Sequence, residues 1–127
     1  MSRVEYLELE DALELARRIG IGPVRDLGLL DSALARPRSS AFGLDAYTEF
    51  PLKAAALLHS LTNNHPLVDG NKRLAWLATT VFCDLNAYTT TLSDDEAFQI
   101  VWDIASSHME VETIAERLSL ELRYPSS

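Results

Sequence analysis

Two apolar segments separated by a short polar loop are the strongest constraint that this sequence places on its fold. Residues 52–61 are mostly alanine and leucine, and residues 74–85 repeat that character with added aromatic side chains. A helix that is apolar on every side must be covered on every side. We therefore expect two buried central helices, with the loop at residues 65–73 held on a rigid base.

The loop reads HPLVDGNKR and brings several kinds of chemistry together in nine residues. Gly70 permits backbone conformations closed to other residues, and the helix that begins after it presents unpaired N–H groups that favour an anion. Lys72 adds a compact ammonium charge, and Arg73 adds a planar guanidinium with several N–H donors. Both groups are suited to binding phosphate. Asp69 is a hard oxygen ligand of the kind that Mg²⁺ prefers, and His65 can accept a proton from a hydroxyl near neutral pH. Phosphoryl or nucleotidyl transfer needs these parts.

The same nine residues resemble a known motif. HPLVDGNKR is similar to the signature of the Doc toxins, a branch of the Fic superfamily, which runs His, any, Phe, any, Asp or Asn, Ala or Gly, Asn, Lys, Arg. The upstream stretch RDLGLLDSALARP also resembles that branch, so the likeness covers roughly residues 20–90. Lys72 replaces the second Gly of Fic proteins proper, and the second Arg of those proteins is missing after Arg73. Both departures favour the Doc branch.

The resemblance implies a role for each matching residue. His65 would be the general base, and Asp69 would hold Mg²⁺. The phosphates of ATP would be held by the Gly70 backbone, Asn71, Lys72 and Arg73. In the Doc branch the Lys is associated with a reversed nucleotide, so the γ-phosphoryl rather than AMP would be transferred, which makes the protein a Ser/Thr kinase. The known target of the family is a threonine of elongation factor Tu, whose modification arrests translation.

Alternative interpretations stay open on the sequence. The chain could transfer AMP, as Fic proteins do, or it could be a catalytically weak antitoxin-binding module, because Leu67 stands where the family has Phe and would pack less firmly beneath the loop. Without the motif, Asp69 could be an N-cap and residues 71–73 an ordinary solvated helix start. Cations at a helix start oppose the helix dipole, however, and such local conflicts are typical of functional positions.

Regulation by a second protein is also expected. Fic proteins often inhibit themselves through a motif of Ser or Thr, three residues, Glu, then Gly or Asn. The nearest match here, Ser106 with Glu110, is followed by Val111 and does not fit. The resemblance therefore implies restraint in trans by a Phd-like antitoxin, whose disordered tail folds into a groove on the toxin.

Length and 47% apolar composition indicate a single compact domain over residues 1–127, and the resemblance implies that this domain is Fic/Doc-like. The apolar runs are shorter than the ~20 residues of a bilayer span, and none opens the chain as a secretory signal would, so we expect a cytoplasmic protein. A net charge of −8 argues against direct contact with nucleic acid or an anionic membrane. The single Cys83 predicts no disulfide, and three His at spacings of 6 and 43 residues predict no zinc site.

Periodicity predicts an all-α fold, a bundle of about six helices that includes the central pair. Short helices are expected at residues 12–19, ending at Gly20, and at residues 27–35, ending before Pro37. A capping box of Ser93 and Glu96 opens a further helix, and the last helix is expected at residues 111–122.

Other features are given structural roles. Outside the helices we expect a short strand at residues 4–7, a surface loop at 37–50, an extended piece at 88–92 and a frayed tail from Pro125. The loop at 37–50 is either a solvated connection or, by hypothesis, a segment that flanks the site and helps to seat the target. Several side chains are expected to have structural roles. Arg25 and Asp26 would form an ion pair, and Trp76 and Trp102 would lie in the core. His59 would lie in the core or support a residue of the site, and His108 would lie on the surface or cap a helix.

Overall fold

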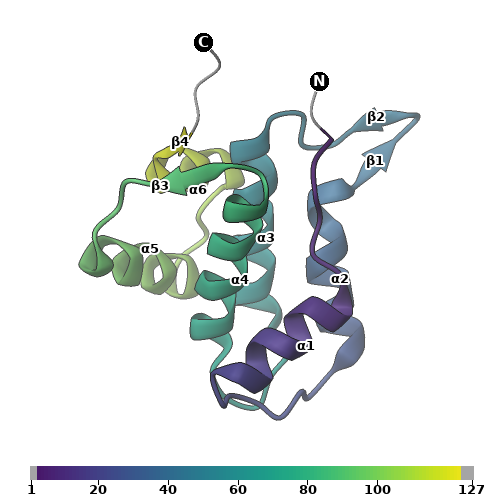
Figure 1. Ribbon diagram of the computed structural model, residues 1–127, viewed down its shortest axis with the longest axis vertical. Helices are drawn as coiled ribbons and strands as arrows, with labels where there is room; N and C mark the ends of the chain where they lie inside the picture. Colours follow the sequence, from purple (N-terminus) through teal and green to yellow (C-terminus); the bar gives the residue numbers. More distant parts are fainter. Residues whose placement is uncertain (1–2, 124–127) are drawn as a thin grey trace.

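The computed structural model describes residues 3–123, which form six α-helices, one 3-10 helix and two small antiparallel strand pairs (Figure 1). The helices are α1 (Leu9–Arg18), α2 (Leu27–Ala35), η1 (Arg36–Arg38), α3 (Phe50–Asn64), α4 (Asn71–Leu85), α5 (Asp94–Ser106) and α6 (Val111–Leu118). The strand pairs are β1 (Ser40–Ala41) with β2 (Leu44–Asp45) and β3 (Tyr88–Thr90) with β4 (Leu120–Leu122). The expected all-α bundle is confirmed. Within residues 3–123, every helix is too short or too polar to cross a membrane.

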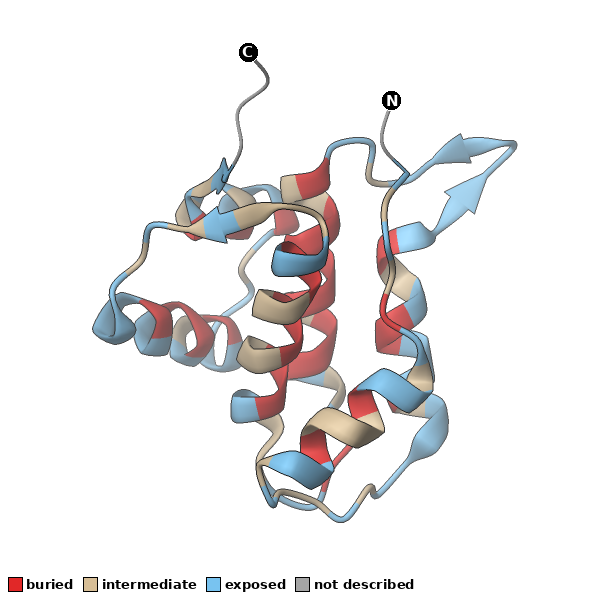
Figure 2. Ribbon diagram, viewed as in Figure 1, coloured by how far each residue is buried: buried red, intermediate tan, exposed pale blue. Residues whose placement is uncertain are grey.

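The helix α3 is the centre of the molecule and is buried along almost its whole length (Figure 2). It packs most extensively against α4 and α6, and α2 and α5 also contact it. Alanines at 54, 55 and 56 are fully buried and let these neighbours approach closely, while Leu57 and Leu58 fill the space beside them. The apolar segments therefore form the central pair that they predict, but only α3 is buried on almost every side. The helix α4 buries one face, and Leu85 at its end is exposed.

Local capping explains where two of the helices begin. At α5 the Ser93 hydroxyl accepts from the Glu96 N–H at 3.2 Å, and the Glu96 carboxylate accepts from the Ser93 N–H at 2.9 Å, which lowers the pKa of Glu96. At α2 the Asp26 carboxylate accepts from the Leu29 N–H at 3.0 Å. Both starts agree with the sequence, and α2 has the predicted bounds.

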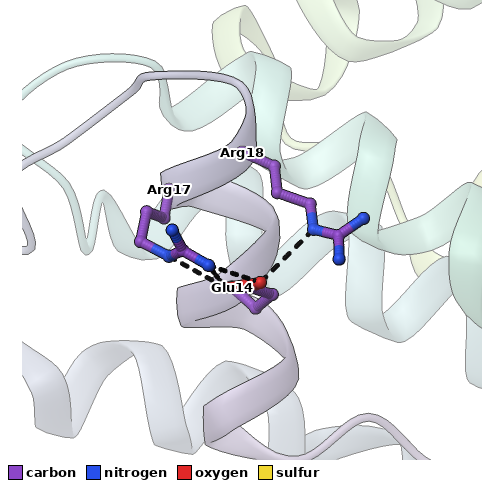
Figure 3. A network of polar contacts seen from close by, with 3 residues as sticks. All are labelled: Glu14, Arg17 and Arg18. Carbon is purple, nitrogen blue, oxygen red and sulfur yellow. Dashed lines mark hydrogen bonds and ion pairs between the residues drawn. The ribbon is translucent and has the colours of Figure 1, made fainter.

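The helix α1 buries alanines and exposes charges. Ala12 and Ala16 lie in the core, while Glu14 accepts hydrogen bonds from Arg17 and Arg18 on the outer face (Figure 3). These hydrogen bonds, first that of Arg17, lower the pKa of Glu14. The side chains are exposed, so the cluster orders the surface of α1 and adds little stability.

Residues 4–7 do not form the expected strand. The Asn86 side chain accepts from the Glu5 N–H at 2.8 Å and donates to the Glu5 carbonyl at 2.9 Å. Tyr6 stacks on Phe82, with ring centroids 5.9 Å apart. The apolar residues of this segment are therefore explained by packing on the end of α4, and a side chain satisfies the backbone in place of a neighbouring strand.

The last helix is shorter than predicted. It ends at Leu118 because Ser119 adopts a left-handed conformation with φ of 53°, and the chain continues as β4. Leu122 pairs with Tyr88 in that strand and is half exposed, so its helical spacing from Leu118 is coincidental. The extended piece at 88–92 is confirmed in part as β3, and the expected tail from Pro125 lies outside the described residues.

Residues 37–50 are not an irregular loop beside the site. They contain most of η1 and the β1–β2 hairpin, which turns at Phe42 and Gly43, both with positive φ. The hairpin lies where α3 begins, whereas residues 65–70 follow the end of α3, about 22 Å away along a 15-residue helix (Figure 1). The hypothesis that this segment flanks the site is therefore wrong, and a role in seating the target stays a prediction.

The two tryptophans differ in environment. Trp76 is partly buried against the core, but Trp102 is 51% exposed on α5 beside Phe98, which is 67% exposed. The core assignment of Trp102 is wrong, because helical spacing does not show which side of α5 lacks a neighbour. Cys83 is buried as expected, and burial raises the pKa of its thiol to about 12.

Candidate active site

The polar loop joins the ends of the two central helices. His65 is the C-cap of α3 and has left-handed φ and ψ of 50° and 56°, with an exposed side chain. The following Pro66 excludes a right-handed helical conformation at this position, as the sequence predicts. A left-handed residue other than glycine costs on the order of 1–2 kcal/mol, so surrounding contacts must hold His65 in place.

The connection between α1 and α2, residues 19–26, supplies those contacts. The backbone N–H groups of Arg25 and Asp26 both donate to the Pro66 carbonyl, at 2.7 and 3.1 Å. The Val68 N–H donates to the Pro23 carbonyl at 3.0 Å, which brings the two chain segments into a short antiparallel arrangement. We call residues 19–26 the bracing connector. Sequence reasoning missed it, because nothing local marks a pairing between segments about 40 residues apart.

Gly70 is required here on two grounds. Its φ is 92°, which glycine adopts without the strain that a side chain brings. A Cβ at this position would also lie 2.6 Å from the Cβ of Ile21 in the bracing connector. The backbone freedom inferred from the sequence is confirmed, and the close approach of Ile21 adds a second reason that only the structure reveals.

The Asn71 side chain holds the loop together through two hydrogen bonds to the backbone of Leu67. Its side-chain oxygen accepts from the Leu67 N–H at 2.8 Å, and its amide nitrogen donates to the Leu67 carbonyl at 2.9 Å. Leu67 is 1% exposed and belongs to the core, so it fills the position that the family gives to Phe. The carboxamide of Asn71 is therefore committed to the loop backbone, and its contact with phosphate stays a prediction.

We expect Asn71→Ala to lower the free energy of unfolding by about 1–3 kcal/mol, because the buried Leu67 N–H loses its acceptor. Asn71→Asp should also destabilise, since it keeps that acceptor but sets a carboxylate oxygen against the Leu67 carbonyl. Urea denaturation measures both. Asn63→Ala is the matched control: Asn63 is exposed and makes no side-chain hydrogen bond within residues 3–123. Equal losses at 63 and 71 would contradict the closure of the loop by Asn71.

Lys72 and Arg73 both face a groove between α4 and α5. This α4–α5 groove has a volume of about 810 Å³ and is lined by Ile19, Lys72, Arg73, Trp76, Leu77, Thr80, Asp94, Ala97, Phe98 and Val101. The Lys72 Nζ lies 5.5 Å from the centroid of the Trp102 ring. Within residues 3–123 neither cation forms an ion pair, so both charges are available to an anionic ligand.

The first turn of α4 adds to this positive charge. The N-cap is Gly70, and no side chain caps the helix, so Asp69 does not play the capping role that the sequence left open. Unpaired N–H groups and the helix dipole therefore favour an anion beside Lys72 and Arg73.

Asp69 is free to bind a metal ion. Its carboxylate is exposed and makes no hydrogen bond or ion pair within the described chain. Among residues 3–123 no group of three His, Cys, Asp or Glu side chains could hold a metal by itself. Mg²⁺ is commonly bound by one or two carboxylates together with nucleotide phosphates and water, so the donors present fit a nucleotide-bound Mg²⁺.

The expected Arg25–Asp26 ion pair is absent from the described structure. The Arg25 guanidinium instead donates to the main-chain carbonyl of His65, with Nε at 3.2 Å and Nη2 closer. Arg25 therefore contacts the end of α3, whereas Asp26 caps the start of α2. The local sequence does not indicate that these neighbouring charges have different partners.

The two other histidines are separate from the loop. His59 receives a hydrogen bond from Arg36 at its Nδ1, 2.7 Å away, and burial followed by the charge of Arg36 lowers its pKa. It is half-buried and ties η1 to α3. His108 is exposed between α5 and α6, as expected.

Comparisons with known proteins match the segments that form this site. Residues 4–83 match the model of the Fic/DOC family, which is more than half of the chain. Toxin Doc of Mycolicibacterium smegmatis is 43% identical over 120 residues, covering 91% of this chain and 92% of that protein. The family match includes the bracing connector, the whole polar loop and most of both central helices.

Proposed function

The chain belongs to the Fic/DOC family, and from that premise we propose that it is the toxin of a toxin–antitoxin pair that transfers the γ-phosphoryl of ATP to a protein hydroxyl. The observation that carries this proposal is the polar loop, which joins an exposed imidazole, an uncapped helix start and two unpaired cations on a braced backbone. The name of the relative supports the role of toxin. A threonine of elongation factor Tu, in the cytoplasm, is the target that the family resemblance implies.

Each residue of the loop would contribute one task. The His65 imidazole would accept the proton of the target hydroxyl as its oxygen forms a bond to the γ-phosphorus. The bond from that phosphorus to the bridging oxygen breaks, and ADP leaves. Lys72, Arg73 and the N–H groups at the start of α4 would hold the phosphate oxygens and stabilise their charge. Mg²⁺ bound at Asp69 would supply further charge neutralisation.

Intact mass spectrometry of elongation factor Tu after incubation with the chain, ATP and Mg²⁺ tests the proposal. A gain of about 80 Da is expected for phosphorylation, whereas about 329 Da would identify AMP transfer and overturn the choice of transferred group. ATP labelled at the γ- or the α-phosphorus gives the same distinction independently. If neither label is transferred, and cells expressing the chain still stop growing with His65→Ala, the chain acts by binding alone.

We propose that the antitoxin inserts an amphipathic helix into the α4–α5 groove. Phe98 lines this groove and stacks on the neighbouring Trp102 with ring centroids 6.1 Å apart, and both residues are more than half exposed. A contiguous exposed apolar surface of this kind is typical of helix-in-groove recognition. Lys72 and Arg73 at the rim would pair with acidic residues of the helix, which would then oppose the binding of nucleotide phosphates.

Phe98→Asp should weaken inhibition by the cognate antitoxin on the order of 10-fold or more, because a buried interface aromatic is replaced by a charge. The measurement is the antitoxin concentration that halves transfer activity. Phe42→Asp is the matched control, since Phe42 is fully exposed at the tip of the distant β1–β2 hairpin. A larger effect from residue 42 than from residue 98 would place the antitoxin elsewhere.

A further inference from the structure

His65 is held in a conformation that it would not adopt on its own. Its left-handed backbone ends α3 one residue before a proline, where an extended conformation is the ordinary choice. A change to extended backbone would carry the exposed imidazole to a different place. The contacts that prevent this change therefore determine where the imidazole lies.

The bracing connector makes the contact that matters most. The Arg25 guanidinium directs two N–H donors, Nε and Nη2, at the main-chain carbonyl of His65. The backbone N–H of the same residue donates to the next carbonyl, that of Pro66, at 2.7 Å. Arg25 therefore donates hydrogen bonds to two successive carbonyls of the loop, although it lies 40 residues away from His65 in the sequence.

We infer that Arg25 is a positioning residue for His65 in the proposed transfer reaction, on which this inference rests. It acts through the main chain of His65 and has no need to touch ATP or the target. Hydrogen bonds from a charged donor are roughly twice as strong as neutral ones, and a planar fork can give two to one carbonyl. Displacement of a catalytic group by about 1 Å can cost up to 10²-fold in rate. Loss of the hydrogen bonds from Arg25 should therefore lower kcat.

Transfer kinetics of Arg25→Ala test the inference. We expect kcat to fall about 10-fold or more, with KM for ATP within about 2-fold of the wild-type value, because the phosphate-binding cations are untouched. Arg25→Lys keeps a charged donor but loses the paired donors of the guanidinium, so its kcat should lie between those of Arg25→Ala and the wild type. Arg17→Ala is the matched control, since this arginine is exposed on α1 and should leave both constants unchanged.

A double-mutant cycle separates positioning from general destabilisation. In a His65→Ala background, Arg25→Ala should cause no further loss, because the group that it positions has been removed. An equal loss in both backgrounds, or a loss carried by KM, overturns the inference. Should Arg25→Ala fail to fold, Arg25→Lys enters the same cycle and is judged by the same outcomes.

A spectroscopic readout keeps the inference independent of the proposed function. In proton–carbon correlation spectra, Arg25→Ala should move the imidazole resonances of His65 and leave those of His108 in place. If the wild-type chain transfers neither phosphoryl nor AMP, the proposed function fails, while this shift still decides whether Arg25 positions His65. Unchanged His65 resonances would overturn the inference even in an active enzyme.

Discussion

Replacing His65 with alanine is expected to reduce group transfer by about 10² to 10⁴-fold, the usual loss when a general base is removed. The protein should remain folded, because the side chain is exposed and its left-handed backbone is held through main-chain contacts that alanine retains. Initial rates of transfer to the target measure the loss. Circular dichroism and urea unfolding measure the fold.

His108→Ala is the control for this substitution. It removes an exposed imidazole that lies between α5 and α6, outside the polar loop, and should leave the rate unchanged. A His65→Ala variant that transfers phosphoryl at the wild-type rate would remove the general base from the mechanism. Growth arrest that persists in cells expressing this variant would point to action by binding.

Gly70→Ala should lower the free energy of unfolding by about 2–5 kcal/mol, the sum of left-handed strain and overpacking. The added Cβ would meet the Cβ of Ile21 at 2.6 Å, and this atom cannot swing away as the end of a flexible side chain can. The bracing connector or the loop must then shift. We also expect transfer to fall on the order of 10²-fold, because the loop carries both the proposed base and the proposed phosphate-binding groups.

Two further variants separate the causes of this loss. Gly43 also has positive φ, but a Cβ there has nothing within 4 Å, so Gly43→Ala measures the backbone strain alone. Adding Ile21→Gly to Gly70→Ala removes the Ile21 Cβ that the new methyl group would meet, so it should recover part of the stability and leave the strain at residue 70. If the alanine variants at 43 and 70 are equally stable, Ile21 does not restrict the loop.

Local signals in the sequence are sufficient where neighbouring residues decide the structure. The end of α2 follows from the nearby Pro37, and the start of α5 follows from its capping box. The apolar segments predict the central pair, and α3 is buried on almost every side because it has no polar face. The glycine in the loop predicts an unusual backbone conformation, and Gly70 has positive φ.

The errors have a common physical origin. Residues 4–7 and Leu122 were assigned from their own spacing, but Asn86 and β3 determine their structure. Trp102 has helical spacing that suits a core position, yet no element within residues 3–123 covers that side of α5. In each case the deciding contact comes from residues far along the chain or is missing altogether, and a local pattern carries no information on either.

By itself the sequence determined the helix pair, the chemistry of the loop between them and the family, because these depend on residue type and short spacing. Only the tertiary structure decided how the loop is held: Arg25 on the His65 carbonyl, Ile21 against Gly70, and Lys72 and Arg73 open to the α4–α5 groove. The bracing connector reaches the loop across about 40 residues. Such a pairing depends on how α1, α2 and the central helices pack, and packing is a property of the whole chain.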